Sequence, residues 1–150
     1  MWRYCWVVPN DLVLKTANTI HRTVLKLSGG RFGWDAGHMP VVQLTTIGRK
    51  SGEPRTVLLT SPHQVGDTMV IVASKGGDDH HPAWFLNLRD HPEVEVVTKN
   101  HATRTMTARI ATADERAELW PIITNKQENY AGYQTKTIRE IPLVLLDPKS

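Results

Sequence analysis

Residues 65–77, with the sequence VGDTMVIVASKGG, combine a turn, an apolar run and a polar loop. Gly66-Asp67 is a pair favoured in tight turns, and it separates two runs of β-branched residues, a pattern typical of a β-hairpin. Residues 69–73 are the most apolar of these runs and predict a buried strand. Ser74-Lys75-Gly76-Gly77 then supplies a permissive backbone for a sharp loop. The segment therefore predicts antiparallel pairing around a buried strand.

Five further short runs share this β-branched composition and are separated by turn-forming residues. They are residues 41–46, 55–61, 93–98, 103–110 and 141–146, and 99–101 predicts a second hairpin turn. Closing such strands into a barrel removes exposed edges that would invite aggregation. About six antiparallel strands with few helices therefore predict a small closed or half-closed β-barrel, of α+β class and mainly β.

An amphipathic helix is predicted upstream of the strands, over residues 12–27. Asn10 or Asp11 caps its start, and Gly29-Gly30 end it. Its four basic residues, Lys15, His21, Arg22 and Lys26, make it unsuitable for spanning a bilayer. Two alternatives stay open: the helix packs on its own domain, or it lies on a membrane surface.

Two further helices interrupt the strands. The first covers residues 83–89, with Pro82 at its first position and His91-Pro92 ending it. The second begins at Thr112, whose hydroxyl faces Glu115 in a capping box. Pro121 is expected to kink or restart this helix.

The chain of 150 residues is long enough for one core, and we expect one structural domain, with an N-terminal helix and arm over residues 1–39 and the β-barrel, which carries the ligand-binding site, over residues 40–150. A net charge of +3 favours acidic small molecules or an anionic surface over nucleic acid. The single cysteine, Cys5, excludes an intrachain disulfide and fits a reducing cytoplasm. The N-terminal residues lack the pattern of a signal peptide.

TTIGRKSGEPR, residues 45–55, joins two predicted strands and carries three cations, Arg49, Lys50 and Arg55. We call Gly48-Arg49-Lys50-Ser51-Gly52 the cationic turn. Its glycines let backbone N–H groups point into one concavity, which with the cations suits phosphate or carboxylate. An ordinary charged hairpin has the same composition, so both interpretations stay open. The glycine spacing of a P-loop is absent.

A second candidate is the glycine loop, Ala73-Ser74-Lys75-Gly76-Gly77, where a strand delivers a hydroxyl and an ammonium to the rim of the sheet. Trp84 and Asn87 follow at one-turn spacing on the next helix, which suits a planar heterocycle that stacks and hydrogen-bonds. The alternatives are a loop that merely eases the chain into the helix and a tryptophan that belongs to the core.

Tyr130 and Tyr133 form a third group at one-turn spacing, able to close over a pocket or merely to pack. Residues 78–81, Asp-Asp-His-His, are too close in sequence to converge easily on one ion, so no metal site is expected. The chain also lacks the GxSxG motif of serine hydrolases.

LTTIGRKSGEPR, VASKGG, HPAWFLNLRDHPEVEV, TADERAELWP and IPLV occur in this order over residues 40–148. Together they resemble the deazaflavin-dependent nitroreductase family, oxidoreductases of actinobacteria, mycobacteria among them, that use coenzyme F420. The resemblance implies a split β-barrel like that of the FMN-binding pyridoxamine-oxidase superfamily.

The resemblance also implies the roles of individual residues. The acidic tail of the coenzyme would be held by the cationic turn and the strand after it, and the deazaflavin ring by the glycine loop and the following helix. Tyr133, Tyr130 and Ser74 would be the catalytic residues, with Tyr133 also beside the ring. The implied coenzyme-binding residues are Arg49, Lys50, Ser51, Gly52, Arg55, Thr56, Ala73, Ser74, Lys75, Gly76, Gly77, Trp84, Asn87 and Tyr133.

The implied activity is hydride transfer from reduced F420 to a quinone such as menaquinone, to an enone such as a conjugated lactone, or to a nitro compound. Gln127 stands where one branch of the family has a further tyrosine, and this departure argues against nitroimidazole reduction. A non-catalytic F420-binding or storage protein and an FMN-dependent oxidoreductase are the alternatives. A cytoplasmic monomer or homodimer, with or without contact to the inner face of the plasma membrane, is expected.

Overall fold

The computed structural model describes residues 35–36, 39–99 and 102–149. The amphipathic helix predicted for residues 12–27 lies outside the described residues, as do Asn100 and His101 of the second predicted turn.

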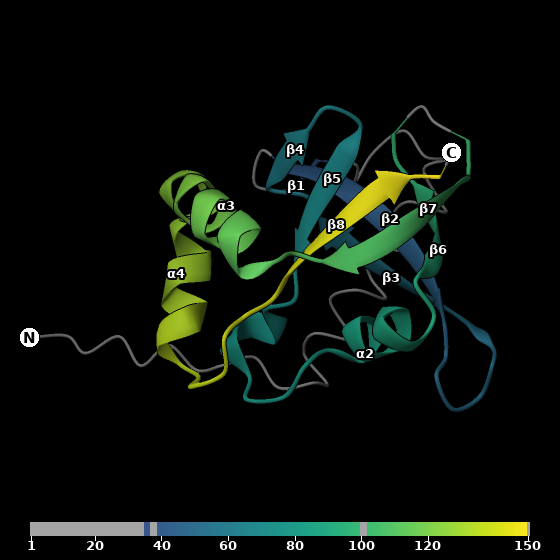
Figure 1. Cartoon of the computed structure of the whole chain (residues 1–150), viewed down its shortest axis with the longest axis horizontal. Helices are drawn as coiled ribbons and strands as arrows, with labels where there is room; N and C mark the ends of the chain where they lie inside the picture. Colours follow the sequence, from purple (N-terminus) through teal and green to yellow (C-terminus); the bar gives the residue numbers. More distant parts are fainter. Residues whose placement is uncertain (1–34, 37–38, 100–101, 150) are drawn as a thin grey trace, which may run out of the picture.

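Within these described ranges, eight strands form one antiparallel sheet in the order β1-β2-β6-β7-β8-β5-β4, with β3 paired to β2 (Figure 1). The six predicted strands are all present, and the two additional strands, β1 and β4, have only two and three residues. Such short strands, one of them the polar His63-Gln64-Val65, carry no periodic pattern that sequence reasoning could detect. The bounds are β1 Asp35–Ala36, β2 Met39–Ile47, β3 Pro54–Thr60, β4 His63–Val65, β5 Thr68–Val72, β6 Glu93–Val97, β7 Arg104–Ile110 and β8 Leu143–Pro148.

The hairpin predicted around Gly66-Asp67 is confirmed, because Val65 pairs with Thr68 across the turn and Gly66 has a φ of 59°. β5 then pairs with β8 on its other side. With both neighbours in place, β5 lies inside the sheet, as its continuous apolar run predicts.

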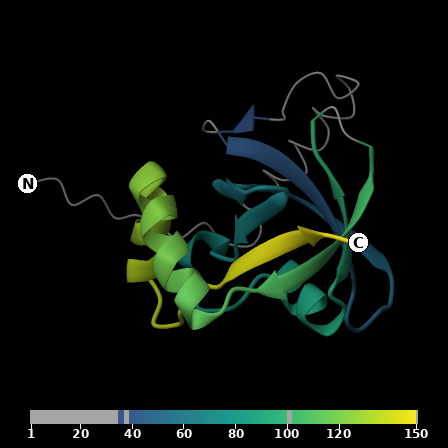
Figure 2. The same cartoon turned by 45° about the horizontal axis from the view of Figure 1, so that its top comes forward.

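In the part of the chain that the structure describes, three α-helices and one short 3-10 helix accompany the sheet: α2 Ala83–Asp90, α3 Ala113–Lys126, α4 Glu128–Thr135 and η1 Lys75–Gly77. Helices α3 and α4 lie side by side at one end of the sheet, whereas α2 contacts β2 and β7 (Figures 1 and 2). The capping box of α3 is confirmed, with the Thr112 hydroxyl accepting from the Glu115 N–H and the Glu115 carboxylate accepting from the Thr112 N–H.

Three helix predictions need correction. Pro82 is the N-cap of α2, with an extended ψ of 149°, and not its first helical residue. Helix α3 continues through Pro121 and does not restart there. Proline has no N–H to donate to the Ala117 carbonyl, but Ala117 and Pro121 are both exposed, so water can solvate that carbonyl. The segment carrying the two tyrosines is a helix, α4, which its mixed composition did not reveal.

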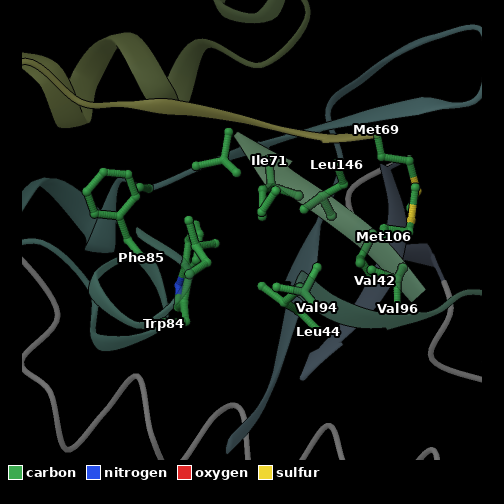
Figure 3. Packing of buried hydrophobic residues seen from close by; sticks show 14 residues of the cluster. Val42, Leu44, Met69, Ile71, Trp84, Phe85, Val94, Val96, Met106 and Leu146 are labelled. Carbon is green, nitrogen blue, oxygen red and sulfur yellow. The ribbon is translucent and has the colours of Figure 1, made fainter. Parts of the chain in front are cut away.

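Two hydrophobic clusters lie on opposite faces of β5. Met69, Ile71 and Ala73 point into the first cluster, whereas Val70 and Val72 point into the second, which α3 and α4 cover. Figure 3 shows the first cluster, with Trp84 and Phe85 at one end and Met69 and Met106 at the other. Burial of both faces explains why residues 69–73 are apolar without alternation.

Candidate functional site

The cationic turn closes the β2–β3 hairpin in one defined conformation. The Gly48 N–H donates to the Glu53 carbonyl at 2.8 Å, and the Gly52 N–H donates to the Gly48 carbonyl at 2.8 Å. Gly52 has a φ of 72°, a left-handed conformation that favours glycine. A Cβ atom at Gly48 would lie 2.5 Å from the Ser51 Oγ and 3.3 Å from the Glu53 carbonyl oxygen, so a side chain there would force the Ser51 hydroxyl to move.

Three cations surround this turn. Lys50 and Arg55 are exposed and Arg49 is half-buried. Within the described residues, no carboxylate lies at salt-bridge distance from any of these three side chains. Thr56, next along β3, has its Oγ1 2.9 Å from the Oγ1 of Thr45 on β2. As far as the described residues go, the turn therefore presents positive charge that no ion pair neutralises.

Asn87 holds the cationic turn against α2. Its Oδ1 accepts hydrogen bonds from both the backbone N–H and the Nη1 of Arg49, each at 3.1 Å. Its Nδ2 donates to the Oγ1 of Thr46 at 3.2 Å, and Asn87 is only 4% exposed. The Asn87 amide is therefore occupied within the protein, and it positions Arg49.

The glycine loop leaves β5 through three consecutive residues with positive φ: Lys75 at 46°, Gly76 at 64° and Gly77 at 87°. The Gly77 N–H donates to the Ser74 carbonyl at 2.9 Å. A Cβ atom at Gly77 would lie 2.7 Å from the Tyr133 carbonyl oxygen, so the loop packs directly against α4. Lys75 forms an ion pair with Asp78 at 3.8 Å.

Sequence reasoning missed Arg139, which lies between α4 and β8 and binds the glycine loop from outside. Its guanidinium donates to the carbonyls of Ala73, Ser74 and Asp78. Nothing in the spacing of a lone arginine in TIREIP signals such a role, because the contacts span 61 to 66 residues of sequence.

Trp84 belongs to the first hydrophobic cluster, where it is 9% exposed and meets Phe85 edge to face at 6.3 Å between ring centroids. Most of the surface of Trp84 is therefore buried in the core, as the core interpretation of this residue predicts. Its role as a platform for a heterocycle stays a prediction.

The two tyrosines of α4 occupy different environments. Tyr130 is 6% exposed in the second cluster, and its hydroxyl lies 3.3 Å from the Thr60 Oγ1. Burial raises the pKa of the Tyr130 hydroxyl above its ordinary value, against the opposing effect of the Thr60 hydrogen bond. Tyr133 is half-buried, with its ring 6.1 Å from that of Tyr130 at 81°. Tyr133 is thus the more exposed of the two tyrosines.

The structure brings the predicted residues together in two groups. The cationic turn joins α2 through Arg49 and Asn87, and the glycine loop joins α4 through Gly77 and Tyr133. His81 lies 3.4 Å from the Arg139 guanidinium, and its ring packs against that of Phe85 on α2 at a tilt of 36°, with 4.7 Å between ring centroids. Burial first, then Arg139 and Arg89, lower the pKa of His81 below its ordinary value.

Neither a metal cluster nor a membrane span is found in the described part of the chain. No three His, Cys, Asp or Glu side chains among residues 39–99 and 102–149 are placed to share a metal ion. The Asp78 carboxylate instead lies 3.1 Å from the Nδ1 of His80. None of the described helices is long and apolar enough to cross a bilayer.

A family model described as F420H(2)-dependent quinone reductase matches residues 18–148. The chain is 36% identical over 130 residues to an F420H(2)-dependent quinone reductase of Mycobacterium tuberculosis, covering 85% of this chain and 87% of that protein. It is similar to this relative over nearly the whole of both sequences.

Solved structures give the same result for the fold. A structure of an F420-H2-dependent reductase, FDR-A, is 38% identical with a TM-score of 0.64, covering 72% of this chain and 94% of that chain. A chain described as a domain-swapped dimer is 32% identical with a TM-score of 0.67, covering 86% and 97%. A Listeria innocua structure named as a pyridoxamine 5'-phosphate oxidase shares the fold alone, with 11% identity, a TM-score of 0.51 and coverage of 87% and 94%. The predicted split β-barrel is confirmed.

Proposed function

Since the chain belongs to the F420H(2)-dependent quinone reductase family, we propose that it binds reduced F420 through its cationic turn and its glycine loop and reduces a quinone. The family resemblance, the oxidoreductase class and the F420 coenzyme are confirmed by the match over residues 18–148. The residues that bind the coenzyme, and the physiological acceptor, are the parts that the proposal adds.

The observation that carries the proposal is the un-neutralised charge of the cationic turn. Arg49, Lys50 and Arg55 lie at one end of the β2–β3 hairpin without a carboxylate partner among the described residues. The tail of F420 carries a phosphate and glutamate carboxylates, and such groups are bound by fixed cations and turn amides. The donor set therefore fits the acidic end of this coenzyme.

The glycine loop supplies the second part of the proposed site. Ser74 offers a hydroxyl and Lys75 an ammonium, and positive φ at three successive residues lets the backbone approach a flat ligand closely. Asn87 acts here through Arg49, because both ends of its amide are already hydrogen-bonded. The bound deazaflavin supplies a hydride, two electrons at once, so the task of these residues is orientation.

Tyr133 is the residue we assign to the acceptor side. It is half-buried on α4, next to Gly77 of the glycine loop. From there its hydroxyl would hydrogen-bond a quinone oxygen and deliver or relay a proton, with Ser74 or water as the other donor. Tyr130 is too buried for this task and supports Tyr133 from the core.

Menaquinone is our first choice of acceptor, and enones such as conjugated lactones are the second. Nitro compounds follow, because Gln127 stands where one branch of the family has a further tyrosine. The cytoplasmic location, contact with a membrane surface and the choice between monomer and homodimer stay predictions; a domain-swapped dimer among the similar structures makes the homodimer a concrete option.

One experiment separates this proposal from its alternatives. Purified protein is mixed with reduced F420 and a menaquinone analogue, and the return of the coenzyme's oxidised absorbance is followed. Quinone-dependent oxidation supports the proposal. F420 binding without oxidation by quinones, enones or nitro compounds would favour a storage protein, and purification with tightly bound FMN and no F420 binding would favour a flavin enzyme.

A further inference from the structure

Arg139 forms an unusually extensive set of contacts for a residue outside any helix or strand. Its Nε donates to the Asp78 carbonyl at 2.8 Å, its Nη2 to the Ser74 carbonyl at 2.9 Å and its Nη1 to the Ala73 carbonyl at 3.2 Å. Nη1 also lies 3.4 Å from the Nδ1 of His81. The planar fork of a guanidinium is suited to bridging several acceptors at once.

These carbonyls lie at the two ends of the glycine loop. Ala73 and Ser74 begin it, and Asp78 immediately follows it. Between them the backbone runs through positive φ, including the non-glycine Lys75 at 46°. Such a conformation is uncommon for a residue with a side chain, and it persists when surrounding contacts hold it. Arg139 supplies these contacts from a position 61 to 66 residues away in sequence.

These three hydrogen bonds from Arg139, which we call the Arg139 clamp, also affect the amides of the loop. The Ala73 carbonyl shares a peptide unit with the Ser74 N–H, and a cation bound to that carbonyl strengthens the amide as a donor. Within the described residues, the Ser74 N–H makes no hydrogen bond. Arg139 therefore polarises the Ser74 N–H, which is available as a donor at the start of the proposed ring-binding loop.

Gln134 ties the same arginine to α4. The Gln134 Nε2 donates to the Arg139 carbonyl at 2.8 Å, and its Oε1 accepts from the Ile141 N–H at 2.9 Å and from the Arg116 Nη2 at 3.2 Å. Gln134 directly follows Tyr133, whose carbonyl packs on Gly77. The backbone that carries Arg139 and the helix that carries Tyr133 are thus held together.

We propose that Arg139 is a positioning residue, which holds the glycine loop in its ligand-binding form and sets its distance from Tyr133. The inference rests on the proposed function in one respect, that the glycine loop binds the coenzyme ring. It adds that the loop depends on a cation whose guanidinium is hydrogen-bonded to the carbonyls of the protein's own backbone.

Arg109 provides a matched control. It also makes charged hydrogen bonds, from Nε to the Asp147 carboxylate at 2.7 Å and from Nη1 to the Glu115 carboxylate at 2.8 Å, and it joins β7, β8 and α3. Among the described residues, its hydrogen bonds and ion pairs join it to Asp147 and Glu115 and to no residue of the glycine loop. Arg109→Gln therefore reports the general cost of losing a bridging arginine, and Arg139→Gln reports that cost together with the loss of the clamp.

Hydrogen exchange without coenzyme is the first measurement. Arg139→Gln is expected to speed exchange of the peptide covering residues 73–79 by about tenfold relative to wild type, while Arg109→Gln leaves that peptide within about twofold. Arg139→Lys keeps the charge but lacks the fork, and it is expected to fall between them. It also serves as the test variant if Arg139→Gln does not fold.

Titration with oxidised F420, followed by the deazaflavin's own fluorescence, is the second measurement. Arg139→Gln should raise the dissociation constant by about tenfold, and Arg109→Gln should leave it within about twofold. Added methylguanidinium should partly restore F420 affinity to Arg139→Ala but not to Lys50→Ala, because only the former leaves a site shaped for it.

The outcomes are distinguishable. Unchanged exchange of residues 73–79 in folded Arg139→Gln, or faster exchange with unchanged F420 affinity, would overturn the inference. Failure of the wild-type protein to bind F420 would overturn the proposed function, and the exchange measurement would then decide by itself whether Arg139 holds the loop.

Discussion

Replacement of Asn87 by leucine tests whether this residue holds the cationic turn or contacts the coenzyme directly. Asn87→Leu keeps the approximate size of a side chain that is 4% exposed and removes three hydrogen bonds. The bonds from the Arg49 N–H and to Thr46 each contribute about 1 kcal/mol, and the bond from the Arg49 guanidinium, half-buried, about 1.5 kcal/mol.

The expected loss in the free energy of unfolding is therefore about 3.5 kcal/mol, which lowers the melting temperature by about 7 to 14 °C in a chain of this length. Asn87→Asp should lose much less, because a carboxylate still accepts both hydrogen bonds from Arg49. Urea unfolding of the wild type and both variants measures these differences.

A double-mutant cycle then identifies the partner. Arg49→Met is combined with Asn87→Leu, and we expect a coupling energy of about 1 to 2 kcal/mol in both unfolding and F420 binding. If Asn87→Leu leaves stability within about 0.5 kcal/mol of wild type and adds independently to Arg49→Met in coenzyme affinity, the reasoning is refuted and Asn87 acts on the coenzyme by itself.

Three further predictions concern the glycine loop, pH and the tyrosines. Gly77→Ala should lower the free energy of unfolding by about 2 kcal/mol, because its Cβ would meet the Tyr133 carbonyl at 2.7 Å and because Gly77 has a φ of 87°. Gly132→Ala, whose Cβ would enter open space, should stabilise the protein by about 0.5 kcal/mol in thermal melts, and equal effects of the two substitutions would contradict the packing. The pKa of His81 is lowered in the folded state, so the unfolded state binds more protons below pH 6.5 and the free energy of unfolding should fall with acidification. His81→Asn should flatten this pH dependence in urea melts at successive pH values, and an unchanged dependence of the free energy on pH would refute the assignment. Tyr133→Phe should lower the rate of quinone reduction more than it lowers F420 affinity. Tyr130→Phe should mainly lower the free energy of unfolding, by about 1 kcal/mol, through loss of the Thr60 hydrogen bond, and the reverse pattern in turnover and melting would contradict these roles.

The strands were predictable because their patterns are local. The turn Gly66-Asp67 and the apolar run after it indicate the hairpin and the buried β5, and the capping box indicates where α3 begins. The order of the strands in the sheet was not predictable from those patterns, because pairing such as β2 with β6 joins residues far apart in sequence. Helix α4 escaped detection because it lacks a clear apolar face.

The site was predictable only in part. Residue types and turns marked the cationic turn and the glycine loop, since charge and glycine spacing are visible in sequence. The contacts that hold them were not visible: Asn87 to Arg49 spans 38 residues and Arg139 to Ala73 spans 66. Burial likewise separated Tyr130 from Tyr133, which the sequence could only treat as a pair.

The central claim is that the un-neutralised cations of the cationic turn and β3 hold the acidic end of F420. Titration of F420 into Lys50→Ala/Arg55→Ala tests it most directly, with Lys126→Ala/Arg89→Ala as a control that removes the same net charge from exposed positions on α3 and α2. We predict that the first variant weakens binding by about 3 kcal/mol, roughly a hundredfold in the dissociation constant, and that the control stays within about threefold of wild type. Wild-type affinity in the Lys50→Ala/Arg55→Ala protein, or equal losses in both variants, would contradict the account.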